Sequence, residues 1–344
     1  MELMLAEMTG VSHTFRYSQA LWDSITKQNT SSLSSCKIFD DSAIVYCCHN
    51  MHVKGIMEYT SIERGNIDAF KLQKEEASQF FYDGFFIVQD CLDKRVLSEA
   101  RLYIDSNYHD FQNVSKRQDD WRLHYLADLT RFDKPFEHVP ILNLLLKSPK
   151  IIAKLESIMG TEISGIFYSQ IALRTPVGDS ASKKEHYSPG AEYHIDGQAN
   201  TAGDRFPDHW TVQIGIALVD IVSQDMGNFA VFTGAHTSRS WINYCDEKKR
   251  KTLPSLGEPH KVCLKAGDVV FAHVLLPHRG GKNICKSDER GFDIRNKIPT
   301  KTREMVFIRV RGQGIDYACK ERSIAVLQNP WHEHRKMIEE FSLV

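Results

Sequence analysis

The chain has 344 residues, a mass of 39.4 kDa, a formal net charge of -1 and an isoelectric point near 6.9. Hydrophobic residues make up 42% and charged residues 25%, as in an average soluble globular protein, which argues against a largely disordered or membrane-spanning chain. Because positive and negative charges balance, the sequence shows no excess of basic residues that would attract a polyanion, so we expect no nucleic-acid partner.

The cysteines and the two ends of the chain indicate a reducing compartment. Eight cysteines are present without Cys-x-x-Cys spacing. The N-terminus lacks the basic and apolar regions of a signal peptide, no apolar run approaches the ~18 residues of a membrane span, and Phe-Ser-Leu-Val is not the peroxisomal signal Ser-Lys-Leu. We therefore expect an intracellular, cytoplasmic protein without a membrane partner.

Residues 1–70 form an N-terminal extension of weak pattern. It contains one predicted helix, Thr14–Lys27, and one predicted strand, Ala43–Cys48. A structural zinc site is not expected, because adjacent cysteines point to opposite faces of a strand and no second ligand pair follows at finger spacing. The residues considered for it are Cys47, Cys48, His49 and His52.

The next part of the chain reads as a helical scaffold. Helices are predicted over Lys71–Phe81 and Lys94–Tyr108, with a strand within Tyr82–Val88 between them. Two further helical pieces are predicted within Pro140–Met159, separated by Ser148-Pro149.

Beyond Gly160 the pattern changes to short β-branched and aromatic runs with turn residues between them. Because no long helices intervene, this spacing predicts an antiparallel unit of sandwich or jelly-roll type, so the fold class is mainly β with flanking helices (α+β). Besides the stretch around His194, the predicted strands are Ile163–Arg174, Thr211–Asp220, Phe229–Phe232, Lys261–Leu264, Val269–His273 and Glu304–Val310.

Two segments complete the organisation of the chain. The charge run Asp246–Lys251 fits a solvated loop better than a nuclear address or an anion site. Asn329-Pro330 predicts an N-cap with proline at the first helical position, starting a helix that ends near Phe341. We divide the chain into an extension (1–70), a main domain (71–320) and a helical tail packed on it (321–344).

One short stretch, Gly190 to Gln198, offers metal-binding chemistry. In extended backbone His194 and Asp196 project from the same face and can converge on one ion. A third ligand is available from His273 or His278, and residue spacing does not choose between them. Two histidines and one carboxylate leave three adjacent positions open on an octahedral ferrous ion.

Four segments in this order resemble the phytanoyl-CoA dioxygenase-like branch of the iron(II)/2-oxoglutarate oxygenases. The resemblance covers about residues 75–315. The first segment is an Asp-Gly strand (Phe81–Val88), and the second is a basic strand with proline that leads to the His-x-Asp pair (Ile171–Asp196). The third is a Gly-rich segment ending in Thr-Gly-Ala-His (Gly227–His236), and the fourth is a strand with two histidines (Gly267–His278).

The resemblance implies a double-stranded β-helix (jelly-roll, cupin-like) core and a metal triad of His194, Asp196 and His278. It also implies Fe(II), 2-oxoglutarate and O2 as cofactor and co-substrates, with ascorbate as an accessory reductant. The expected activity is a dioxygenase that hydroxylates or otherwise oxidises an unactivated C–H bond of a small-molecule or acyl-CoA-like substrate, releasing succinate and CO2. Halogenating relatives lack the carboxylate, so Asp196 implies hydroxylation or a related oxidation such as desaturation.

In the family an arginine at the start of the strand after the distal histidine binds the C5 carboxylate of 2-oxoglutarate. Arg303 matches this position, and a planar guanidinium can grip a carboxylate through two parallel hydrogen bonds. Arg290 and Arg295, in an inserted loop, are rival anchors. Gln170 and Arg174, on the strand that enters the site, are further co-substrate candidates.

The substrate side is less defined. Tyr193 and Gln198 are candidate substrate contacts, and the residue two beyond the distal histidine, often a hydroxyl in relatives, is Gly280. Neither length nor charge identifies the substrate or the oligomeric state. Two alternatives stay open: a cupin-type metal enzyme that does not use 2-oxoglutarate, and a non-catalytic jelly-roll protein that binds a metal or ligand.

Overall fold

The computed structural model describes most of the chain beyond residue 66. The described residues are 67–114, 122–127, 145–174, 193–196, 210–246, 252–281, 283, 302–317 and 319–343, without the side chains of 106–114, 122–127, 167, 168 and 320. All of them fall within one compact unit, Cys48–Val344. The predicted elements before residue 60, the cysteine–histidine group near residue 50 and residues 247–251 of the charge run lie outside the described residues, and the domain boundaries stay predictions.

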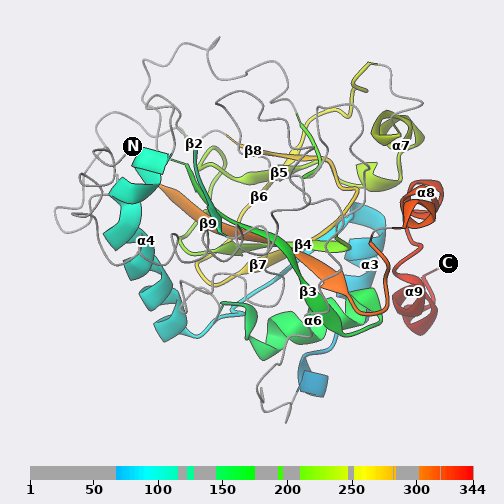
Figure 1. Ribbon diagram of the computed structural model, residues 1–344, viewed down its shortest axis with the longest axis horizontal. Coiled ribbons are helices and arrows are strands. Elements are labelled where there is room, and N and C mark those ends of the chain that lie inside the picture. Colours follow the sequence, from blue (N-terminus) through cyan, green and yellow to red (C-terminus); the bar gives the residue numbers. More distant parts are fainter. Residues whose placement is uncertain are drawn as a thin grey trace, which may run out of the picture. The chain divides into compact units, whose positions relative to one another are not determined.

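The described residues form an α+β structure with a six-stranded antiparallel sheet at its centre (Figure 1). The strand order is β1-β7-β4-β9-β3-β2. The strands, in that order, are Phe85–Val88, Val269–His273, Val212–Ala217, Arg303–Gly312, Ile163–Arg174 and Arg122–Ala127. The long pairing of β3 with β9 places Arg174 opposite Arg303.

A second antiparallel sheet has three strands in the order β6-β5-β8. Its strands are His260–Val262, Phe229–Val231 and His278–Gly280. A buried apolar cluster packs residues of this sheet, such as Phe229 and Val262, against Val270, Met305 and Phe307 of the large sheet. The two sheets therefore face each other across a common core.

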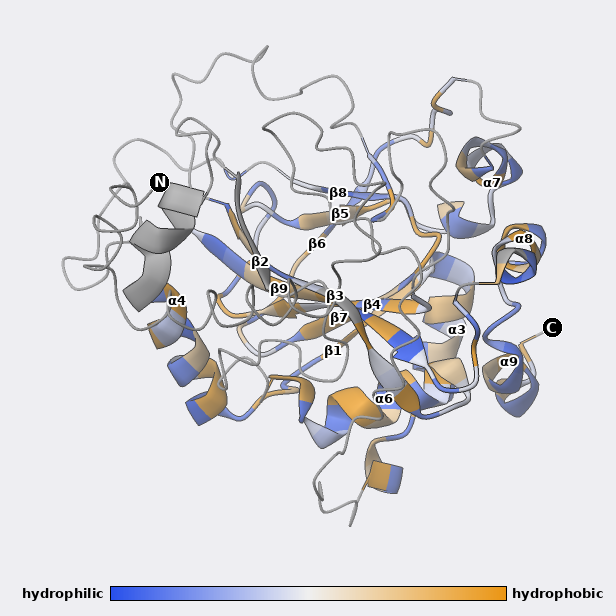
Figure 2. Cartoon of the chain, in the orientation of Figure 1, coloured by the Kyte–Doolittle hydropathy of each residue, from blue (hydrophilic) through white to orange (hydrophobic). Residues whose placement is uncertain are grey.

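The other face of the large sheet is covered by helices. Alternate residues of its strands, such as Phe271 and Ile308, pack in one cluster with Phe80 of α3 and Leu155 of α6. Figure 2 shows hydrophobic residues along the strands and α6. Because both faces of the sheet are buried, its central strands read as nearly continuous apolar runs.

The part of the chain that the structure describes contains six α-helices and two 3-10 turns. Within these residues no helix combines the length and apolarity that crossing a membrane requires. Their bounds are Lys74–Asp83 (α3), Lys94–Val114 (α4), Pro149–Met159 (α6), Arg239–Cys245 (α7), Lys320–Gln328 (α8) and Arg335–Phe341 (α9), with 3-10 turns at Ile67–Phe70 (η3) and Ala235–Thr237 (η4).

Local chemistry explains where two helices begin. The Glu76 carboxylate accepts the backbone N–H of Gln73 at 2.8 Å, so α3 starts at Lys74 and not at the predicted Lys71. Proline occupies the first position of α6, so the break predicted at Ser148-Pro149 is where this helix begins. Of the helical piece expected before it, residues 140–144 lie outside the described residues.

The predicted start of the C-terminal helix is wrong. Asn329 caps a turn, since its Oδ1 accepts the N–H of Trp331 at 3.1 Å, and α9 begins only at Arg335. The turn lets the Trp331 ring stack on Phe81, with ring centroids 4.5 Å apart. Packing of this aromatic residue therefore outweighs the local helix signal of Asn329-Pro330.

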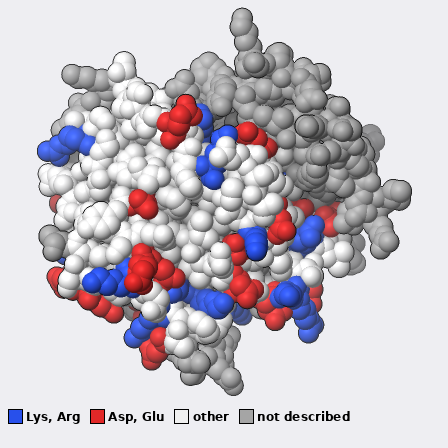
Figure 3. All heavy atoms as spheres, turned by 180° about the vertical axis from the view of Figure 1, so that it is seen from behind, with Lys and Arg blue, Asp and Glu red and all other residues white. Residues whose placement is uncertain are grey.

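The described residues on the face drawn in Figure 3 form no large region of a single charge sign. Acidic and basic side chains of the described residues are interspersed there. Such a distribution creates no strong field over this face.

A buried histidine cluster, defined as His236, His273 and His334, holds the C-terminal segment. Ring centroids of His236 and His334 each lie 5.1 Å from that of His273. His334 Nδ1 donates to the Ile158 carbonyl at 3.0 Å. Burial lowers the pKa of all three imidazoles, that of His236 to about 4.

We predict that this cluster makes stability fall in mild acid. The folded protein keeps these imidazoles neutral while the unfolded chain takes up protons below pH ~6.5, so the free energy of unfolding decreases as pH falls from there towards 4. For His236 alone the full loss is ~3 kcal/mol, from the difference between 6.5 and about 4. Denaturant unfolding at several pH values measures it.

His236→Gln should be less stable at pH 7.5 but should lose less stability on acidification than the wild type. The matched control is His260→Gln, at an exposed position. An acid dependence of His236→Gln equal to that of the wild type would contradict the prediction.

Candidate metal centre

The site begins with a backbone pair between two histidines. His194 and His278 exchange both amide hydrogen bonds, at 2.9 and 2.8 Å, and form an isolated antiparallel bridge. Directly paired residues of an antiparallel ladder place their side chains on the same face. The two imidazoles accordingly lie together, with ring centroids 4.9 Å apart.

The ring of His278 is oriented by its own strand. Its Nδ1 lies 3.0 Å from the carbonyl oxygen of Leu276, and since a carbonyl can only accept, Nδ1 carries the hydrogen. This leaves the Nε2 lone pair available to a metal. The ring is almost fully buried and packs near the ring of Phe229, whose centroid lies 4.9 Å away.

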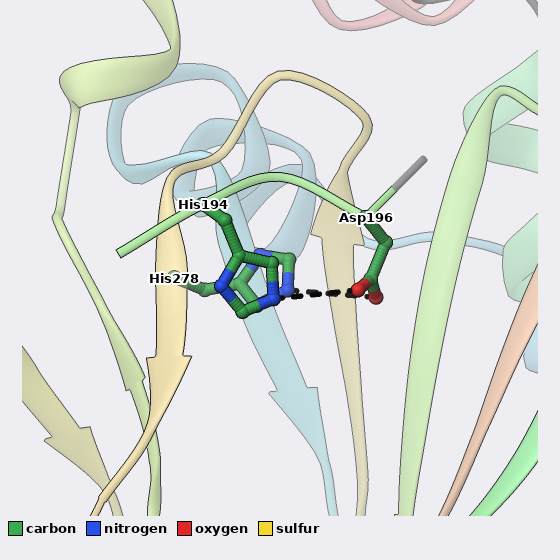
Figure 4. A group of neighbouring side chains, drawn as sticks. All are labelled: His194, Asp196 and His278. Atoms are coloured by element: carbon green, nitrogen blue, oxygen red, sulfur yellow. Dashed lines mark ion pairs between the residues drawn. The ribbon is translucent and has the colours of Figure 1, made fainter. Parts of the chain in front are cut away.

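Asp196 completes the group. Its Oδ1 lies 3.5 Å from Nε2 of His194, and its Oδ2 lies 3.5 Å from Nε2 of His278 (Figure 4). One ligand atom from each of the three residues falls within 4.8 Å of the others. The His194 side chain is 46% exposed, so the group opens to one side.

The electrostatics keep Asp196 ionised. Burial by itself would raise the pKa of the carboxyl, but the Arg309 guanidinium and the imidazoles of His194 and His278 hold it well below its usual value. An ionised carboxylate beside two imidazole nitrogens is a donor set suited to a divalent transition metal. The residues present therefore fit a metal ion.

Arg309 is a functional candidate that sequence reasoning missed. It lies on β9, is almost fully buried, and forms an ion pair with Asp196. The available signal was a charged residue within the apolar run of β9, spaced by an even number of residues from Arg303 and hence on the same face.

His273, the rival third ligand, lies elsewhere. It packs with the helix side of the large sheet, near Phe80 and Trp331. Its Nε2 donates to the Pro330 carbonyl at 2.9 Å, and its Nδ1 accepts the Leu275 N–H at 3.0 Å. With both ring nitrogens engaged, His273 is a satisfied core histidine.

Arg174 and Arg303 bring two buried guanidinium groups to the inner face of the large sheet. They are direct cross-strand partners and both are almost fully buried. Burial and the charge of Arg174 lower the pKa of Arg303 well below its usual value. Nε of Arg303 has no hydrogen-bond partner within the described part of the chain. Such a pair would be stabilised by an anion.

Glycines make room for this pair. A Cβ at Gly280 would lie 1.7 Å from an Arg174 terminal nitrogen, so the guanidinium occupies the space that a side chain at this position would need. A Cβ at Gly227 would lie 3.1 Å from the Cβ of Arg303. Because Gly280 follows His278 by two residues, the Arg174 guanidinium lies on the same face of β8, about 6.6 Å along the strand from the histidine.

The remaining predicted site residues separate into three groups. Gln170 Oε1 lies 3.4 Å from an Arg309 nitrogen, near the metal group. Tyr193 packs in an aromatic cluster, with ring centroids 4.7 Å from Phe232 and 5.4 Å from Trp241, and its contact with substrate stays a prediction. Three others lie outside the described residues: Gln198, Arg290 and Arg295.

Comparisons with known proteins give only distant likenesses. No family model and no curated protein matches the chain. Among solved structures, HygX from Streptomyces hygroscopicus with nickel and 2-oxoglutarate bound is 14% identical, with a TM-score of 0.45 over 71% of this chain and 89% of HygX. At this level a match assigns no activity.

Two enzymes of nogalamycin biosynthesis match similarly. The non-haem α-ketoglutarate-dependent carbocyclase SnoK is 17% identical, with a TM-score of 0.43 over 70% of this chain and 84% of SnoK. The epimerase SnoN is 19% identical, with a TM-score of 0.43 over 71% and 87%. Any reaction assigned to this chain therefore depends on the chemistry of its own site.

We predict that metal binding depends on His278 and not on His273. In an anaerobic titration of the metal-free protein with Co(II), His278→Ala and Asp196→Ala should weaken binding by roughly 100-fold or more, since losing a ligand costs at least as much as losing a residue that orients one. His273→Asn should retain the affinity while losing thermal stability. Equal losses for the two histidine variants would contradict this assignment.

Proposed function

We propose that this protein is an Fe(II)- and 2-oxoglutarate-dependent oxygenase with a jelly-roll (double-stranded β-helix) core. The observation that carries the proposal is the convergence of His194, Asp196 and His278, from two segments distant in sequence, on a group within 4.8 Å. HygX has been solved with iron bound and, separately, with nickel and 2-oxoglutarate bound. We propose that this chain likewise binds a metal, here Fe(II), together with 2-oxoglutarate.

The protein residues would provide a facial set of ligands and exclude water. His194 and His278 would each offer Nε2, and Asp196 one carboxylate oxygen, which leaves three adjacent positions for other ligands. Once bound, Fe(II) and 2-oxoglutarate would supply the electrons that activate O2. 2-Oxoglutarate would be converted to succinate and CO2, and a substrate C–H bond would be oxidised.

Arg303 and Arg174 would hold the distal carboxylate of 2-oxoglutarate. A carboxylate would satisfy the buried Nε of Arg303 and would relieve the repulsion between the two guanidiniums. Both side chains lie on the inner face of the large sheet, and Arg174 reaches the face of β8 that carries His278. The co-substrate would thus bridge the arginine pair and the metal group.

This arrangement favours the oxygenase over its two rivals. A cupin-type metal enzyme without 2-oxoglutarate would have no use for a buried pair of arginines such as Arg174 and Arg303. A non-catalytic ligand-binding protein would not need a metal group that opens on one side, where the His194 side chain is 46% exposed. Neither rival has an observation of its own in its favour.

Arg303→Ala is expected to raise the 2-oxoglutarate concentration needed for half-saturation by roughly 10- to 100-fold, because charge-assisted hydrogen bonds contribute about 1.5–3 kcal/mol each. Co(II) affinity should change little. The measurement is the visible charge-transfer band that forms when the protein is titrated anaerobically with Fe(II) and 2-oxoglutarate. Asp196→Ala should abolish the band.

Arg295→Ala is the matched comparison, because it removes the same charge from the rival anchor position between His278 and Arg303. If Arg295→Ala weakens 2-oxoglutarate binding and Arg303→Ala does not, the anchor is misassigned. If the wild-type protein binds the metal but forms no band, the oxygenase proposal is wrong.

Turnover tests the reaction itself. We expect O2-dependent conversion of 2-oxoglutarate to succinate that one class of small molecule, acyl-CoA thioesters included, stimulates at least tenfold over the uncoupled rate, about 1.4 kcal/mol in barrier height. Mass detection of a +16 or −2 product separates hydroxylation from desaturation. Asp196→Ala is the inactive control, and absence of succinate across the panel would count against the proposal.

A further inference from the structure

Arg309 belongs to the inner face of the large sheet. Along β9 the residues Arg303, Met305, Phe307 and Arg309 alternate with residues that face the helices, and Met305 and Phe307 lie in the core between the sheets. Arg309 therefore extends into the same interior as the co-substrate arginines, but at the other end of the strand.

The contact of Arg309 is with the metal-group carboxylate itself. A terminal nitrogen of its guanidinium pairs with Oδ2 of Asp196, and the Arg309 side chain is only 3% exposed. The neighbouring strand β3 supplies Gln170, whose Oε1 lies 3.4 Å from the same nitrogen. The guanidinium is therefore held from two sides and is oriented towards Asp196.

A purely structural role explains this contact poorly. The segment that carries Asp196 is already joined to β8 by the two backbone hydrogen bonds of His194 and His278. What the backbone pair leaves undetermined is the rotation of the Asp196 carboxylate. Arg309 restricts that rotation, because it engages Oδ2, which also lies 3.5 Å from Nε2 of His278, and leaves Oδ1, 3.5 Å from Nε2 of His194, available to an ion.

We propose that Arg309 is a positioning residue that restricts Asp196 to binding the metal through one oxygen. The inference rests on the metal site of the proposed function. A carboxylate with both oxygens on the metal would take one of the three positions that the co-substrate and O2 need. A guanidinium on the second oxygen prevents this and fixes the ligand before the metal arrives, as residues that orient metal ligands generally do.

The test compares Arg309→Gln and Arg309→Lys with wild type in anaerobic Co(II) titrations of the full chain, without 2-oxoglutarate. We expect a 10- to 100-fold loss of affinity in Arg309→Gln, the usual cost of removing a group that orients a metal ligand. Partial rescue is expected in Arg309→Lys. The Co(II) ligand-field absorption of Arg309→Gln should also change, because the carboxylate can then use both oxygens.

Arg311→Gln is the matched control. Arg311 lies two residues further along β9, and its guanidinium carbon lies 4.8 Å from the centroid of the Tyr317 ring. The Arg311→Gln variant should bind Co(II) with the affinity and spectrum of the wild type. A fall in thermal stability shared by both glutamine variants would be the structural contribution of a charged residue on this strand.

Two outcomes overturn the inference. If Arg309→Gln binds Co(II) with wild-type affinity and spectrum, Arg309 has a structural role only. If Arg309→Gln binds Co(II) more tightly than the wild type, Arg309 competes with the metal for Asp196. If Arg309→Gln does not fold, Arg309→Met, which keeps an apolar stem without the charge, takes its place and is judged by the same two outcomes. Failure of the wild type to bind Co(II) would instead remove the metal site of the proposed function, and with it this role.

Discussion

The candidate site depends on the pair of backbone hydrogen bonds between His194 and His278. These bonds join a short extended segment to β8, and β8 is held in its sheet by β5. Because the two residues face each other in the narrow pair of an antiparallel bridge, their imidazoles must lie on one face. The position of Asp196, two residues further on, results from the same alternation. Without this bridge the metal ligands would not converge.

The buried arginines lie in the same interior between the two sheets as the metal group. The inner face of β3 and β9 carries the guanidiniums of Arg174, Arg303 and Arg309, all almost fully buried. Burying charges is costly unless they are paired, and Asp196 compensates Arg309. Arg174 and Arg303 are cross-strand partners six residues along β9 from Arg309, and the charge of Arg174 acts on the Arg303 guanidinium.

The two faces of the large sheet divide structural from functional residues. On the helix side, His273 is neutral and satisfied by backbone groups. On the inner side, His278 presents an available Nε2 beside a carboxylate. The same residue type therefore serves packing on one face and metal chemistry on the other, and the surroundings, not the imidazole, make the difference.

Strand patterns were predictable where both faces are buried. The bounds of β3 and β7 agree with Ile163–Arg174 and Val269–His273, because β-branched and aromatic residues fill them. The strand β2, Arg122–Ala127, was not predicted, since Arg122 and His124 interrupt its apolar residues. The start of α9 was misplaced because stacking of Trp331 on Phe81, a contact distant in sequence, competes with a local capping signal.

By itself the sequence determined which chemistry is available: a His-x-Asp pair, two candidate third histidines and several arginines near β-runs. Resemblance to a family indicated His278 and Arg303, but residue spacing could not. The tertiary structure gives the physical reason, because His273 and His278 lie on opposite sides of the large sheet. It alone revealed Arg309 as the partner of Asp196, since the packing of segments distant in sequence, which no local pattern encodes, decides which buried charges meet.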